Sequence, residues 1–266
     1  MIKRILKITF LVILIVGFFV SLGFVDKEQN KLKCKDIIVN IDNEDLFFVE
    51  SPDIKAYFKD KGDSIVNQLI KTVDIAKLEH VLQVHPAIDE AQVYIDGRNI
   101  LQVHIKQRKP VVRIYNANGE NYYLDNKGRL MPISEKYAAR VLIANGSIYE
   151  PYNKRYLYSV EDILKNDFAK YYSKLDDIYA IAEYLSKNSF WNSQIQQLFV
   201  NEENEIELIP IVGNHIIVFG DGSDVEEKFT KLKLFYLEGL NKTGWWNNYA
   251  VINVKYKGQL VCTKRY

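Results

Sequence analysis

The chain has few cysteines, few prolines and almost no net charge, and each of these limits excludes a class of protein. The cysteines, Cys34 and Cys262, match no metal-ligand spacing, because a zinc site needs Cys or His residues a few positions apart. A formal net charge of +1 provides no basic stripe for nucleic acid. Six prolines beside eighteen tyrosines and thirteen phenylalanines favour a strand-rich globular protein. An oxidising compartment would permit a Cys34–Cys262 disulfide, although two unpaired thiols are the simpler interpretation.

Motifs that carry chemistry are also lacking. There is no Gly-x-Ser-x-Gly, no phosphate-binding glycine loop and no His-Glu-x-x-His. Glu205 and Glu207 alternate with apolar residues, which favours a solvated strand face over an acid pair for sugar hydrolysis. We therefore expect no catalytic residue, no cofactor, no metal and no small-molecule substrate. Structural or surface positions are expected for the four histidines, His80, His85, His104 and His215.

The one long hydrophobic run lies at the N-terminus. No charged residue occurs from Ile8 to Val25, which at a rise of about 1.5 Å per residue spans a bilayer core of about 30 Å. The end of the run has no small-residue cleavage site, so we predict an uncleaved anchor rather than a signal peptide. Residues 1–25 would form the tail and transmembrane helix, and 26–34 a tether. Lysines flank both sides and do not decide the orientation, and we expect the ectodomain outside the cytoplasm.

Residues 35–109 predict the order strand, helix, helix, strand, strand. A strand is predicted at Asp36–Asp42, with Ile37, Val39 and Ile41 on one face. Ser51 is a candidate N-cap before Pro52, and a second helix begins near Asp74. The turn Asp96-Gly97-Arg98-Asn99 then joins two alternating strands.

The second half predicts a mixed β-sheet domain with two amphipathic helices, so the fold class is α+β. One helix carries its apolar face from Leu175 to Leu185, and the other begins with Asp224 and Glu227 in a capping-box-like arrangement and ends near Gly239. Residues 149–172 have no clear period. The predicted strands are Arg140–Ala144, Ile195–Val200, Glu205–Ile209, His215–Phe219, Tyr249–Tyr256 and Gln259–Cys262.

One module and three sequence motifs, in this order, resemble the FtsQ/DivIB cell-division family. The β-α-α-β-β module after an anchor looks like a POTRA domain. Residues 107–112 (QRKPVV) are similar to the family's Glu-Arg-x-Pro-Val junction, with Gln107 in place of the Glu. Residues 122–132 (YYLDNKGRLMP) resemble its hairpin, and residues 252–261 (INVKYKGQLV) its C-terminal signature. The resemblance covers nearly the whole chain apart from residues 149–172.

The resemblance implies a POTRA-like domain at 35–109 and an FtsQ-type β domain at 110–266. It also implies a non-catalytic scaffold of the bacterial divisome, single-pass in the inner membrane at the septum, which binds FtsB/FtsL-like single-pass division proteins. β-Strand addition near the C-terminus is the expected mode. The expected partner-binding residues are Trp245, Trp246, Tyr249, Tyr256, Lys257, Gln259, Leu260 and Val261.

Other interpretations remain open. Core packing explains Trp245 and Trp246 equally well. A weaker second surface is expected on the sheet edge at residues 100–106. The alternative functions are a POTRA-containing chaperone or transport component of the cell envelope, and a membrane-anchored cell-wall enzyme.

Overall fold

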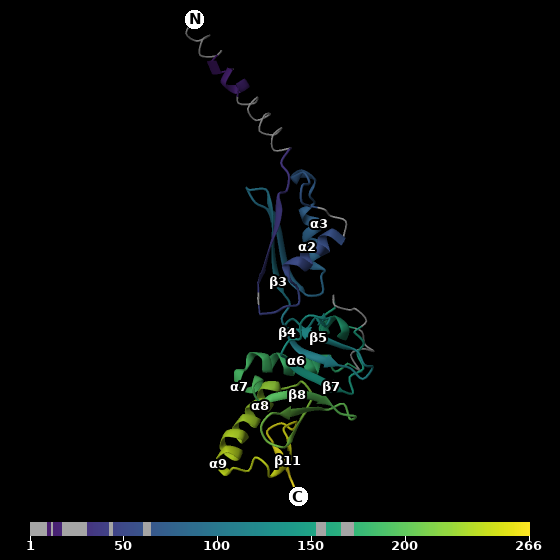
Figure 1. The fold of residues 1–266 in the computed structure, drawn as a ribbon. Helices are drawn as coiled ribbons and strands as arrows, with labels where there is room; N and C mark the ends of the chain where they lie inside the picture. Colours follow the sequence, from purple (N-terminus) through teal and green to yellow (C-terminus); the bar gives the residue numbers. More distant parts are fainter. Residues whose placement is uncertain are drawn as a thin grey trace. The chain divides into compact units, whose positions relative to one another are not determined.

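The structure, a computed structural model, describes residues 10–11, 13–17, 31–42, 45–60, 65–152, 158–165 and 173–266. The chain divides into two compact units (Figure 1). Unit 1 extends to Asp45 and includes Val49–Gln107, whereas unit 2 comprises Leu46–Phe48 and Arg108–Tyr266.

The predicted membrane anchor lies mostly outside the described residues, which include only 10–11 and 13–17 of that segment. In the described part of the chain, no helix combines the length and the apolar character that crossing a membrane requires. The anchor therefore stays a prediction.

Unit 1 has a three-stranded sheet in the order β1-β3-β2, in which β1 runs parallel to β3 and β2 antiparallel to it. Both helices lie on one face of this sheet (Figure 1). They bury Ile54, Phe58, Leu78 and Leu82, and each such side chain contributes about 1.5–3 kcal/mol through its removal from water. The elements in chain order are β1 (Asp36–Asp42), α2 (Ser51–Asp60), the 3₁₀ turn η1 (Ile70–Thr72), α3 (Ile75–Gln83), β2 (Ile88–Ile95) and β3 (Ile100–Gln107).

These elements confirm the predicted strand and helix order of the first half. Asp74 caps α3 by accepting a hydrogen bond from the Lys77 amide. The start of α2 was predicted one residue too late. Ser51 is already helical, and the Glu50 amide donates to the Asp53 carboxylate at 3.0 Å.

Unit 2 is built on a nine-stranded mixed sheet in the order β12-β11-β10-β9-β8-β7-β4-β5-β6. Parallel neighbours need a crossover between them, and the chain supplies helices for this purpose. The parallel pair β7 and β8 is joined through α4, α6 and α7, and the parallel pair β10 and β11 through α8 to α9. The strands are β4 (Pro110–Tyr115), β5 (Asn121–Asp125), β6 (Leu130–Met131), β7 (Leu142–Gly146), β8 (Ile195–Val200), β9 (Ile206–Pro210), β10 (Ile216–Gly220), β11 (Tyr249–Asn253) and β12 (Val261–Lys264). The helices are α4 (Val160–Leu164), α6 (Leu175–Lys187), α7 (Ser189–Asn192), α8 (Val225–Leu234), the π-helical turn η2 (Phe235–Leu240) and α9 (Asn241–Thr243).

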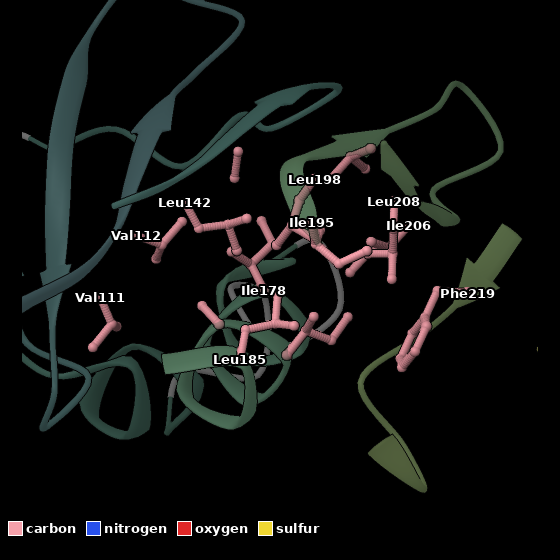
Figure 2. Packing of buried hydrophobic residues seen from close by; sticks show 14 of the residues in the cluster. Val111, Val112, Leu142, Ile178, Leu185, Ile195, Leu198, Ile206, Leu208 and Phe219 are labelled. Carbon is pink, nitrogen blue, oxygen red and sulfur yellow. The ribbon is translucent and has the colours of Figure 1, made fainter. Parts of the chain in front are cut away.

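The core of unit 2 lies between the sheet and these crossover helices. Figure 2 shows Ile178 and Leu185 of α6 beside Ile195 and Leu198 of β8, all buried. The predicted amphipathic faces of α6 and α8 are confirmed, since Leu175, Ile178, Ala182 and Leu185 of α6 and Phe229 and Leu232 of α8 are buried. α4 lies within residues 149–172, for which the sequence showed no clear period. The helix begins with a capping box formed by Ser159 and Asp162. Hydrogen bonds from Lys165 and Ser159 lower the pKa of Asp162 to about 2.

Three local predictions in unit 2 were wrong. Asp224 does not cap α8, because its φ of 47° is left-handed and its side chain makes no cap hydrogen bond. The helical segment passes Gly239 and ends at Gly244, where φ is 71°. β7 lies two residues later than predicted and includes Asn145 and Gly146, because they pair with β8.

The last strand also differs from the prediction of Gln259–Cys262. Gly258 has φ 67°, and the Gln259 amide donates to the Tyr256 carbonyl at 3.3 Å. Gln259 therefore closes a turn, Leu260 follows it, and β12 begins only at Val261. β11 is shorter than predicted and ends at Asn253.

Candidate partner-binding site

β12 is an edge strand of the nine-stranded sheet. It pairs with β11 on one side, and in the described part of the chain no strand lies on its other side. The Arg265 amide donates to the Asn248 carbonyl at 2.9 Å, which directs that N–H toward β11. Successive N–H groups of a strand point in opposite directions. The backbone N–H and C=O groups of Lys264 and Cys262 therefore point away from β11, where a further strand could form hydrogen bonds with them.

The turn before β12 is held against α8 by polar contacts. Lys231 donates from Nζ to the carbonyls of Val254 at 3.2 Å and Tyr256 at 2.6 Å. Glu227, predicted as part of a capping box, accepts instead from the Gly258 amide at 3.2 Å. These bonds fix the start of β12 against α8, so the outer edge of the strand is held in place.

A groove lies beside the turn, between it and the end of α8. Its volume is about 560 Å³, and its apolar lining includes Leu234, Phe235 and Leu260 with the Cys262 side chain. Leu234 is 63% exposed and Leu237 of η2 is 42% exposed. The end of α8 and η2 therefore present two exposed apolar side chains.

A second groove lies at the other end of β12. Trp245 and Tyr249 line it together with Lys264, Arg265 and Tyr266, in a volume of about 370 Å³. Trp245 is half exposed, whereas the Tyr249 ring packs 5.8 Å from Phe235. The edge strand thus has a recess at each end.

The structure separates the two adjacent tryptophans that the sequence left undecided. Trp246 packs edge to face on Tyr236 at 5.0 Å and near His215 at 6.4 Å, which is core packing. Trp245 is open to solvent and remains a contact candidate.

The other predicted site residues divide between the edge and its turn. Val261 is 48% exposed on β12. Tyr256, Lys257 and Gln259 are exposed on the turn, and Leu260 is half-buried in the first groove. Leu234 and Leu237 were missed by sequence reasoning. The two leucines had a signal, because they lie off the buried Phe229–Leu232–Tyr236 face of their helix.

The exposed charged side chains of the turn and of the end of β12 are positive, whereas Glu238 lines the first groove. Lys257, Lys264 and Arg265 are exposed along the turn and the strand, and Arg265 donates to the Asn214 carbonyl. Burial raises the pKa of the Cys262 thiol, which keeps it protonated and unreactive. Cys34 and Cys262 are both free cysteines, as the simpler interpretation predicted.

The structure gives hydrogen-bond partners to the two glutamates and to His215, for which structural or surface positions were predicted. Glu205 accepts from Lys255 Nζ at 2.8 Å and Glu207 from the Asn201 amide nitrogen at 3.1 Å, so each has a structural partner. His215 is buried and bonded to the Tyr236 hydroxyl at 2.8 Å. Among the described residues, no three His, Cys, Asp or Glu side chains gather as a metal site.

Comparison with known families identifies both units. Residues 32–106 match the model of the POTRA-like domain. Residues 109–263, well over half of the chain, match the model described as FtsQ/DivIB, C-terminal related. The chain belongs to the FtsQ/DivIB family. No curated protein matches it significantly.

Membership of the FtsQ/DivIB family indicates a scaffold role in the bacterial divisome. The family is a non-catalytic one that acts through protein–protein interactions during cell division. The β12 edge, its two grooves and their positive rim are the features of this FtsQ/DivIB chain that bear on such an interaction.

Proposed function

We propose that this chain is a non-catalytic, membrane-anchored scaffold that binds single-pass division proteins of the FtsB/FtsL kind by β-strand addition to β12. The observation that carries the proposal is the outward-facing backbone of β12 at the end of a nine-stranded sheet. An added strand would satisfy those groups and gain affinity from main-chain hydrogen bonds. The predicted helix in 1–25 would hold the protein in the inner membrane, with the ectodomain outside and the septum as its place of action.

Side chains on both sides of the edge support the same mode. The grooves would receive apolar residues that flank an incoming strand, on Leu234 and Leu260 at one end and on Trp245 at the other. Lys257, Lys264 and Arg265 favour a partner segment that carries acidic residues, because complementary charge steers encounter and fixes register. The bound segment would thus be an acidic strand with apolar ends.

Photo-crosslinking in living cells tests this proposal. A crosslinking residue replaces Val261 in the full-length protein, and a control replaces Ile133, which is also exposed but follows β6 at the opposite edge of the sheet. We expect Val261 to capture a single-pass division protein and Ile133 not to do so. Equal capture at both positions, or none at Val261, would contradict the proposal.

Two substitutions at one position separate the backbone from the side chain. Lys264→Pro removes an outward N–H that the fold does not use, and proline is tolerated on an edge strand in this orientation. Lys264→Ala removes the charge and keeps the N–H. Strand addition predicts that Lys264→Pro abolishes capture at Val261 while Lys264→Ala only weakens it. If the two variants behave alike, the partner does not bind by adding a strand.

A further inference from the structure

Three segments of unit 1 meet where the chain enters it, and they carry four exposed lysines, Lys31, Lys33, Lys35 and Lys71, which we name the lysine collar. Lys33 forms an antiparallel bridge with Leu69, and the Ile70 amide donates to the Leu32 carbonyl at 2.9 Å. These bonds place Lys71 beside the entering segment. On its other side, the Lys35 amide donates to the Asn99 carbonyl at 2.8 Å in the β2–β3 turn.

Three of the four lysines of the collar keep a charge that no carboxylate of the described chain neutralises. Lys33, Lys35 and Lys71 form no ion pair with any residue of the described chain. Nearby carboxylates have other partners. Asp96 accepts from the Ile100 amide at 3.0 Å and from the Arg98 guanidinium at 2.8 Å, and these bonds hold the pKa of Asp96 well below its usual range. Asp36 is 4.0 Å from Lys55 Nζ, and Asp74 caps α3.

Apolar side chains accompany these lysines. Leu32 lies between Lys31 and Lys33 and is exposed, and so is Val66, whose neighbour Asn67 donates from its amide to the Cys34 carbonyl at 2.8 Å. Lysines mixed with exposed aliphatic side chains are the composition of surfaces that lie on a bilayer, with cations on phosphates and apolar groups in the headgroup layer.

The position of the collar in the chain identifies its partner. Lys31 follows the predicted end of the anchor, Val25, by six residues, so the extended chain allows a separation of at most about 20 Å. We infer that the lysine collar binds the anionic headgroups of the membrane that holds the anchor, and so fixes unit 1 against the bilayer. This inference rests on the anchor in the proposed function, and it does not depend on β12.

The tether alone would leave unit 1 free to turn, whereas the collar would restrict it. An anionic membrane surface attracts each nearby lysine enough to change the ratio of docked to free protein by a factor of about five. Removing three lysines therefore lowers that ratio by about a hundredfold, and the interaction weakens in high salt as the Debye length shrinks to about 3 Å at 1 M.

Hydrogen exchange on the full-length protein in lipid nanodiscs tests the inference. Phosphatidylcholine discs are compared with discs that also contain phosphatidylglycerol. We expect residues 31–36 and 66–72 to exchange more slowly in the anionic discs, and 1 M NaCl to remove the difference. The triple variant Lys33→Gln, Lys35→Gln, Lys71→Gln should lose the protection. A control with the same charge loss in unit 2, Lys127→Gln, Lys187→Gln, Lys233→Gln, should keep it.

The outcomes separate the inference from the function on which it rests. If the chain is inserted and the collar segments exchange equally in both kinds of disc, the lysines do not bind anionic headgroups. An acidic protein would then be the candidate partner, and the inference would be wrong while the proposed function stands. Protection that survives the collar substitutions would also overturn it. A chain that does not enter the discs would overturn both the anchor and the inference.

Discussion

Asp125 is the residue of unit 2 whose replacement has the most clearly defined cost. Its side chain is fully buried, and its carboxylate accepts from the amides of Lys127 and Arg129 and from Arg129 Nε, each at 2.9 Å. Arg108, 2% exposed, places its Nε 3.9 Å away and donates to the Leu130 carbonyl at 3.2 Å. The carboxylate therefore holds the β5–β6 turn and balances a buried cation at once.

We expect Asp125→Ala to lower the free energy of unfolding by about 3–5 kcal/mol, because it removes three hydrogen bonds of the β5–β6 turn and the buried carboxylate that faces the buried Arg108. Asp125→Asn keeps an oxygen for the two turn amides but loses the charge and the acceptor for Arg129 Nε, so about 2 kcal/mol is expected. The partly exposed Arg129 contributes less, and Arg129→Ala should cost about 1 kcal/mol.

Urea unfolding of the full-length protein, followed by tryptophan fluorescence, measures these differences, because all three tryptophans lie in unit 2. The double variant Arg108→Met, Asp125→Leu replaces the pair with apolar side chains and should recover most of the stability lost in Asp125→Ala. If the double variant loses the sum of its two single variants, or if Asp125→Ala costs less than about 1 kcal/mol, the reasoning about a buried ion pair is wrong.

Three further predictions follow from single sites. Burial lowers the pKa of His215 to about 4, and an unfolded histidine titrates near 6.5, so the unfolded chain takes up the proton first as the pH falls. Stability should drop by up to about 3 kcal/mol between pH 6.5 and 4 in urea titrations, and His215→Gln should remove that drop. Gly146→Ala would drive its Cβ into the Val200 carbonyl oxygen at φ 102°, and about 3 kcal/mol should be lost on thermal unfolding, in contrast to the open Gly97→Ala. Trp246→Ala should cost about 2 kcal/mol in urea unfolding, whereas Trp245→Ala should leave the unfolding midpoint unchanged and reduce partner capture at Val261.

Local patterns were sufficient for most elements of both units. β1 and β8 have their predicted bounds because both are short runs rich in β-branched and other apolar residues, which are typical of strands. α3 and α6 were recognisable from apolar spacing that matches the helical period, and α3 begins beside Asp74 as predicted. The end of β7 was predicted wrongly because Asn145 and Gly146 have the composition of a turn, whereas in the structure both pair with β8.

The sequence alone determined the element types, the two-part organisation and the family motifs, because these depend on interactions between residues close together in the chain. Only the tertiary structure decided that β12 forms the edge of the sheet, that Trp246 is packed while Trp245 is open, and that Lys71 joins three lysines some forty positions earlier. Strand order and burial depend on which distant segments meet. A periodic pattern shows which side chains share the buried face of a helix or strand, but not which neighbouring element covers that face.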